Sequence, residues 1–190
     1  MENILAVLVQ ILAIYLAADF VGGFFHWAED TLGRDSTPFW GPVFVKPNMV
    51  HHERPGEMAR IPWLINNIPI ALGTVSILTV VWLLGALNWQ WLLFGAIGGF
   101  NQQAHRFAHM PTMRLPKFVR FLQKIGLLQD ARHHWGHHTF PHITRYCVLT
   151  PWLNPILDKL RFWRLAERIL VPMFGAPRRP DLANFSWYRG

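Results

Sequence analysis

Long apolar stretches without a basic residue are the strongest constraint on the fold of this chain. No Lys or Arg occurs in residues 1–33 or 61–105, and these stretches contain three apolar runs, at about residues 4–25, 65–87 and 89–107. Each run is close to the roughly 20 residues that a helix needs to cross a bilayer. The short polar break at Asn88 would fold the second and third runs into an antiparallel hairpin. We therefore expect an all-α integral membrane protein with about three transmembrane helices.

The basic residues predict the orientation of these helices. The chain has 18 Lys and Arg in total; four of them (Arg34, Lys46, Arg54 and Arg60) lie between the first two runs, and the rest follow the third. By the positive-inside rule, the C-terminus is cytoplasmic and the N-terminus is extracytoplasmic. The membrane would be the inner or plasma membrane of a bacterium, or the endoplasmic reticulum of a eukaryote. The first run has no basic flank or clear cleavage site, which favours a retained span over a signal peptide.

Composition favours lipid over nucleic acid as the partner of the basic residues. The chain is 52% hydrophobic and only 15% charged, with a net charge of +7. Its basic residues alternate with apolar runs, which suits an anionic membrane surface. We expect residues 1–190 to form a single domain, with a cytoplasmic helical cap over about residues 110–190. Within this cap, residues 115–131 predict an amphipathic helix that lies on the membrane or packs on the cap, and residues 155–170 predict a further helix.

Ten histidines all fall at or beyond the cytoplasmic ends of the predicted spans. Insertion into a membrane does not require histidine to be sorted in this way. Several are four residues apart, which places two rings on one face of a helix, and Pro141 would end the helix that carries the last cluster. The ten are His26, His51, His52, His105, His109, His133, His134, His137, His138 and His142.

Neutral imidazole is a good ligand for first-row transition metals, so this sorting predicts a metal site at the cytoplasmic face. Structural zinc needs only four ligands, whereas eight to ten imidazoles indicate two ions, and a nitrogen-rich pair favours iron used in oxygen chemistry. Taken alone, His26 is more simply a polar anchor at the membrane surface. The lone Cys147 excludes an internal disulfide and a zinc site built on cysteines.

Other cofactors fit the pattern less well. Bis-histidine haem in a membrane bundle would place its ligands inside facing spans, whereas these histidines lie at helix ends and in loops. A zinc protease of the HExxH type needs Glu after the first histidine, where this chain has Arg106 and Trp135. A non-enzymatic metal-binding or metal-transfer protein stays open as an alternative.

Two acidic residues near the histidines have candidate roles. Asp19 lies inside the first apolar run, where an ionisable group is costly and is usually paired or functional. It either points toward the metal site or ties this helix to another one, such as the helix that carries Asn66 and Asn67. Asp30 follows His26 by four residues and could accept a hydrogen bond that orients its ring.

The histidine motifs together resemble the Kua/CarF-type lipid desaturases. The resemblance covers most of the chain from Asp19 onward and rests on "HWAEDT" (26–31), "HHERP" (51–55), "HRFAH" (105–109), "HHWGHHTFPH" (133–142) and the segment that follows at 146–169. The family includes plasmanylethanolamine desaturase, which makes the vinyl ether bond of plasmalogens, and a plant plastid enzyme that desaturates palmitate on phosphatidylglycerol. This resemblance implies an oxidoreductase with two histidine-ligated iron ions and O2 as co-substrate.

The resemblance also implies a ligand set, a substrate and a partner. His133 matches the motif as well, and it would either position a ligand or be a further ligand itself, as could Asp30 and Asp19. The substrate would be a membrane phospholipid, with the alkyl chain of an ether lipid favoured over an acyl chain. A related di-iron hydroxylase stays open because both reactions begin with the same hydrogen abstraction. No flavin, haem or ferredoxin signature is present, so electrons would come from a separate cytochrome b5-like or ferredoxin-like donor. The implied ligands are His26, His51, His52, His105, His109, His134, His137, His138 and His142.

Overall fold

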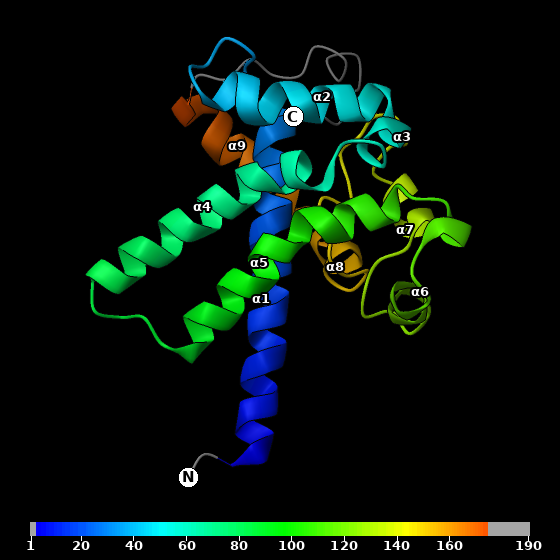
Figure 1. Cartoon of the computed structure of the whole chain (residues 1–190). Helices are drawn as coiled ribbons and strands as arrows, with labels where there is room; N and C mark the ends of the chain where they lie inside the picture. Colours follow the sequence, from blue (N-terminus) through cyan, green and yellow to red (C-terminus); the bar gives the residue numbers. More distant parts are fainter. Residues whose placement is uncertain (1–2, 175–190) are drawn as a thin grey trace.

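The computed structural model describes residues 3–174, and this part of the chain is helical and contains no strand (Figure 1). The longest helices are those that the apolar runs predict, and shorter helices follow each of them. In chain order the elements are α1 (Ile4–Thr31), the π-helical turn η1 (Gly41–Val45), α2 (Lys46–Glu53), α3 (Pro55–Met58), α4 (Trp63–Leu83), α5 (Trp89–Ala108), the 3-10 turn η2 (Thr112–Arg114), α6 (Lys117–Lys124), α7 (Ala131–Trp135), α8 (Leu153–Lys159) and α9 (Phe162–Phe174).

Two helices in residues 3–174, α1 and α4, are long and apolar enough to cross a membrane. The third predicted span corresponds to α5, which has 20 residues but does not meet the same criterion. The reason is its C-terminal end, where residues 101–106 read NQQAHR and are polar except for Ala104. The polar end of α5 is also the end that carries the histidines.

The two halves of α1 have different surroundings. Its N-terminal half extends beyond the other helices, and apolar side chains such as Ile4, Leu5 and Leu8 are exposed there (Figure 1). Its C-terminal half is covered, and Trp27 is completely buried. The helix continues beyond the apolar run to Thr31, so His26 and Asp30 both lie on α1.

Glycine allows the C-terminal half of α1 to lie very close to another segment. A Cβ atom at Gly23 would lie 2.7 Å from the Cys147 Sγ and 2.9 Å from the Cys147 backbone nitrogen. The segment around Cys147 is therefore in direct contact with the helix. Trp27, Tyr146, Cys147 and Trp163 form a buried apolar cluster that joins α1 to α8 and α9.

The helices α4 and α5 pack against each other as an antiparallel pair joined by residues 84–88 (Figure 1). Asn88 caps α5, because its side-chain oxygen accepts a hydrogen bond from the Trp91 N–H at 3.1 Å. The helix α5 also packs along α1, where the Asn101 amide donates to the Ala18 carbonyl at 3.0 Å. The C-terminal ends of α1 and α5 consequently meet on one side of the molecule.

The helices of the predicted cap are shorter than the sequence patterns suggest. The amphipathic helix is α6, which ends at Lys124, with Phe118 and Phe121 exposed. The helix expected over residues 155–170 is divided into α8 and α9 at Arg161, whose φ is +52°. The part of the cap beyond residue 174 lies outside the described residues.

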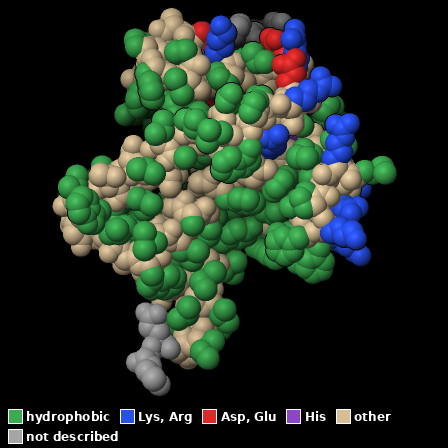
Figure 2. All heavy atoms as spheres, viewed as in Figure 1, with side chains coloured by type: hydrophobic (Ala, Val, Ile, Leu, Met, Phe, Trp, Pro, Cys, Tyr) green, Lys and Arg blue, Asp and Glu red, His purple; other side chains and the backbone are tan. Residues whose placement is uncertain are grey.

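Charge and apolar surface are separated on the face drawn in Figure 2. Apolar side chains cover α4, α5 and the lower part of α1, whereas Lys and Arg gather along the upper and right-hand edges. This separation is the pattern expected of a protein with one part in lipid and another part in water.

Candidate metal centre

The histidines meet where the C-terminal ends of α1 and α5 approach α2, α7 and the segment after α7. Two sets of side chains there each have ligand atoms within 4.8 Å of one another. The first group contains imidazoles only, and the second contains imidazoles and one carboxylate. Group 1 is His51, His105, His109, His134 and His138, and group 2 is His26, Asp30, His52 and His137.

In group 1 the Nε2 atoms of four rings converge. The distance from His105 Nε2 to His134 Nε2 is 2.9 Å, and the distance from His105 Nε2 to His109 Nε2 is 3.2 Å. His138 Nε2 lies 3.1 Å from His134 Nε2. The fifth ring, His51, has its centroid 4.4 Å from that of His109, and neither of its nitrogens has a hydrogen-bond partner in the described structure.

This arrangement fits a metal ion better than a hydrogen-bond network. An Nε2 atom of a neutral imidazole carries either one proton or one lone pair, and His105 and His134 each have two close Nε2 neighbours, so the three contacts cannot all be hydrogen bonds at once. Imidazole nitrogens bound about 2.1 Å from one ion at right angles would be about 3.0 Å apart, which is close to the observed separations. The convergent lone pairs of group 1 can therefore hold a cation.

In group 2, backbone carbonyls orient two of the rings. His26 Nδ1 lies 3.1 Å from the Tyr146 carbonyl oxygen, and His137 Nδ1 lies 2.8 Å from the Thr144 carbonyl oxygen. Because a carbonyl only accepts, each Nδ1 carries the proton and each Nε2 offers a lone pair. Neither Nε2 atom has a hydrogen-bond partner among the described residues, so both rings are prepared for a metal.

Asp30 lies at the centre of group 2. One carboxylate oxygen accepts from the Asn48 amide and lies 2.9 Å from His52 Nε2, while the other lies 3.6 Å from His137 Nε2. Asp30 does not make the expected hydrogen bond to His26 within the described residues, although both belong to the same group. Asp30 is thus placed among the ligand atoms of group 2, and Asn48, which sequence reasoning missed, holds it there.

The two groups are adjacent. The ring centroids of His26 in group 2 and His105 in group 1 are 5.2 Å apart, and those of His134 and His137 are 5.7 Å apart. Metal ions held by both groups would therefore be neighbours.

Burial keeps the rings in the neutral form that binds metal. It lowers the pKa of His51, His134 and His137 well below the usual value, and neighbouring imidazoles lower it further. The same causes, burial first, lower the pKa of His109 to about 3 and that of His138 to about 2. These five imidazoles are therefore uncharged at neutral pH.

Local structure near the last cluster explains how one short segment serves both groups. The Asp130 side chain caps α7 by accepting from the His133 N–H at 2.8 Å, and α7 ends at Trp135. The prediction that this helix continues to Pro141 is wrong, because the chain turns after Trp135. His134 on the helix reaches group 1, whereas His137 after the turn reaches group 2.

Two predicted histidines lie outside both groups. His142 follows the turn, where its Nδ1 lies 3.1 Å from the His137 carbonyl oxygen and its ring centroid is 5.0 Å from that of His52. His133 points away from the metal groups, and its Nε2 accepts a hydrogen bond from the Asn154 amide at 3.0 Å. Asn154 also bonds to the backbone of Cys147 and so links α7 to the segment that orients His26.

Asp19 neither points toward the metal site nor ties α1 to the helix that carries Asn66 and Asn67. Its carboxylate accepts from the Leu149 N–H at 2.8 Å, the Thr150 N–H at 3.0 Å and the Thr150 hydroxyl at 2.7 Å. It therefore does not contact the metal groups, Asn66 or Asn67. Instead, it fixes residues 149–150 against α1, which positions the carbonyl of Tyr146 for His26. No motif in the sequence predicts these hydrogen-bond partners.

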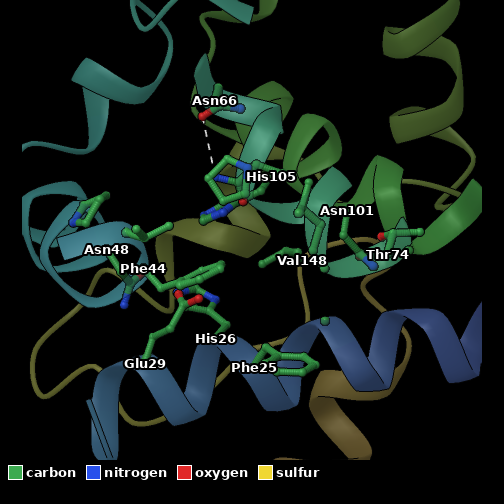
Figure 3. Close-up of a pocket in the computed structure, with 18 of the residues that line it drawn as sticks. Phe25, His26, Glu29, Phe44, Asn48, Asn66, Thr74, Asn101, His105 and Val148 are labelled. Atoms are coloured by element: carbon green, nitrogen blue, oxygen red, sulfur yellow. Dashed lines mark hydrogen bonds between the residues drawn. The ribbon is translucent and has the colours of Figure 1, made fainter. Parts of the chain in front are cut away.

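A cavity of about 750 Å³ lies beside the histidines (Figure 3). His26, His51 and His105 form part of its wall, and one part of it continues between α1, α4 and α5, where Ile77, Leu78 and Phe94 make the wall apolar. Residues of η1, α2 and α3 line it as well. A volume and an apolar lining of this kind suit the hydrocarbon chain of a lipid.

Known proteins are similar to this chain in sequence. A family model described as "Lipid desaturase domain" matches residues 15–181. Plasmanylethanolamine desaturase 1 of Mus musculus is 30% identical over 95% of this chain and 70% of its own length, and plasmanylethanolamine desaturase of Myxococcus xanthus is 31% identical over 88% of this chain and 62% of its own length. Fatty acid desaturase 4, chloroplastic, of Arabidopsis thaliana is 32% identical over 91% of this chain and 54% of its own length. No solved structure matches the chain.

Proposed function

The chain belongs to the lipid desaturase family, and from this membership we propose that it is an oxygen-dependent di-iron desaturase of membrane phospholipid chains. The observation that carries the proposal is that two adjacent histidine-rich groups border a largely apolar cavity. A metal-binding protein without catalytic activity has no need for such a cavity.

Group 1 and group 2 would each hold one iron ion. The ligands of the first would be His51, His105, His109, His134 and His138, and those of the second would be His26, Asp30, His52 and His137. His142 would complete the second site after a small movement, because its ring already lies beside that of His52. Iron ions held by these residues would supply activation of O2: with two electrons and two protons from a donor, O2 and two hydrogens from adjacent carbons of the chain would give a double bond and two water molecules.

The protein's own residues position the ligands and exclude water. The Tyr146 and Thr144 carbonyls hold the protons on the Nδ1 atoms of His26 and His137, so both rings present Nε2 to the centre. Asp19 holds the segment that supplies the Tyr146 carbonyl. A C–H bond offers no polar handle, so the cavity walls must hold the chain in place by shape.

The membrane arrangement follows from the positions of the apolar and basic residues. We propose that residues 1–190 form one domain in which α1, α4 and α5 cross or enter the bilayer, with the N-terminus extracytoplasmic and the C-terminus cytoplasmic. The polar end of α5 would lie at the cytoplasmic interface beside the metals. The exposed Phe118 and Phe121 of α6, together with Lys117 and Arg120, would rest on the membrane surface.

The direction of the cavity favours an ether lipid as the substrate. The apolar part of the cavity between α4 and α5 lies away from the histidines, so a chain that occupies this part would keep its glycerol end beside the metals. The first two carbons of an alkyl chain would then react, and a vinyl ether would form. The alternative is an acyl chain, which is supported by relatives named fatty acid desaturase 4.

Electrons would come from a separate protein. The sequence contains no flavin, haem or ferredoxin signature, so a cytochrome b5-like or ferredoxin-like donor would reduce the metal centre at the cytoplasmic face.

The test is expression in a host that lacks plasmalogens and is supplied with alkyl ether lipids, followed by lipid mass spectrometry. We expect ether lipids that have lost two hydrogens and that release an aldehyde in mild acid. Loss of two hydrogens from acyl chains would support the alternative substrate, and a gain of one oxygen would indicate a hydroxylase. Unchanged lipids in cells that contain the iron-loaded protein and a reductant would contradict the proposal.

A further inference from the structure

One side-chain amide in the cavity wall has no partner for its donor group. Asn66 on α4 is only 7% exposed, and its Nδ2 finds no hydrogen-bond partner among residues 3–174. Its neighbour Asn67 is equally buried, but the Asn67 amide donates to the Trp63 carbonyl at 2.7 Å and does not line the cavity. An unpaired buried donor is destabilising, so Asn66 is the residue of this pair that a ligand would satisfy.

Asn66 contacts α5 near His105, and both residues line the cavity. The Asn66 side-chain oxygen is 3.5 Å from the Gln102 amide, the contact drawn as a dashed line in Figure 3. Gln102 precedes His105 by three residues, which is about 4.5 Å along the axis of α5. The residue that contacts Asn66 is therefore within one helical turn of a group 1 histidine.

Other polar groups of the cavity wall are less suited to the same role. The Asn101 amide already donates to the Ala18 carbonyl, and only its oxygen is left without a partner. The linkage between a lipid chain and glycerol contains oxygen acceptors and no donor, so it offers nothing to that oxygen. Further from the histidines the wall is formed largely by Gly73, Ile77, Leu78 and Phe94.

We propose that the Asn66 amide binds the uncharged oxygen that joins the lipid chain to glycerol, and thereby selects which carbons react. This inference rests on the proposed function and extends it to the position of the double bond. An oxygen held at Asn66 leaves the first carbons of the chain beside group 1 and the remainder of the chain in the apolar part of the cavity. Without the hydrogen bond, the chain can slide along the cavity and present carbons that are further from the linkage.

The oxygen can belong to an ether or to an ester, because both accept a hydrogen bond. The experiment therefore uses two lipids that differ only at the first glycerol position, 1-alkyl-2-acyl and 1,2-diacyl phosphatidylethanolamine. The iron-loaded enzyme is compared with Asn66→Leu, which has a similar volume and no donor, and with Asn66→Asp, which remains polar and loses the donor. Asn67→Leu is the matched control, because it changes an equally buried amide that does not line the cavity.

Each variant is measured for lipid binding, for KM and kcat, for double-bond position and for iron content. We expect both Asn66 variants to lose the thermal stabilisation that the preferred lipid gives, and their KM for that lipid to rise about tenfold. Part of the product should carry the double bond further from the linkage, and iron content should match that of Asn67→Leu. The lipid that is affected identifies the oxygen as that of an ether or an ester.

Two other results have distinct meanings. If the unchanged enzyme desaturates lipid and both Asn66 variants match Asn67→Leu in KM and in double-bond position, the inference is wrong and the proposed function stands. If the unchanged enzyme converts neither lipid, the proposed function fails, and the binding measurement alone decides whether Asn66 recognises the linkage.

Discussion

The two histidine groups differ in charge and in the elements that build them. Group 1 consists of five imidazoles, carried mainly by α2, α5 and α7, whereas group 2 combines three imidazoles with the carboxylate of Asp30. An ion in group 1 would keep its full charge in a buried site, and an ion in group 2 would be partly neutralised. The rings of group 2 are also held by carbonyls of the loop after α7. The comparison indicates that helices supply most ligands of both groups, and that the segment after α7 additionally orients His26 and His137 of group 2.

The largest expected effect is the loss of group 1. In His105→Ala, two of the closest Nε2 contacts of the group disappear. We expect desaturation to fall more than about a hundredfold, because removing an outer partner of a ligand already costs 10–100-fold. The measurements are desaturase activity in isolated membranes and the amount of iron bound per chain. His133→Ala is the matched control, since His133 bonds to Asn154 outside both groups, and its iron content should be unchanged. Retained iron and activity in His105→Ala would refute the assignment of group 1.

A smaller effect is expected from the carboxylate of group 2. Asp30→Asn keeps the shape of the side chain and removes its charge, so we expect metal affinity at group 2 to fall about 10–100-fold. Iron should decrease from two ions per chain toward one when the protein is titrated with chelator. Glu53→Gln is the control, because Glu53 is an exposed carboxylate next to His52 in the sequence. An equal decrease in both variants would show that the charge acts at long range and not as a ligand.

The smallest effect is expected from the packing that supports group 2. In Gly23→Ala the new Cβ would overlap Cys147, so the backbone at Tyr146 must move away from His26. We expect a destabilisation of about 1–3 kcal/mol, seen as a lower Tm, and weaker iron binding at group 2 than at group 1. Gly99→Ala is the control, because its nearest contact would be Thr74 at an ordinary 3.8 Å. Equal Tm and iron content in the two variants would show that iron binding at group 2 does not depend on this packing.

Much of the architecture could be predicted from periodicity and composition. The apolar runs predict where α1, α4 and α5 lie, although α1 continues past its run to Thr31, because a helix in lipid must satisfy its own backbone and so follows local sequence. The spacing of His105 and His109 likewise predicts two rings on one face of α5. Boundaries in the cap were predicted less well, since the division at Arg161 and the turn after Trp135 depend on contacts with other segments.

The sequence by itself determined that this protein carries a histidine-rich site at the basic end of apolar helices, because both properties are recorded as residue types along the chain. Only the tertiary structure decided how the histidines divide into two groups, that Asp30 joins one of them, and that Asp19 bonds to Leu149 and Thr150. The partners of Asp19 are about 130 residues away in the chain. Local sequence spacing does not predict contacts between residues so far apart in the chain, because these contacts form only when the whole chain packs.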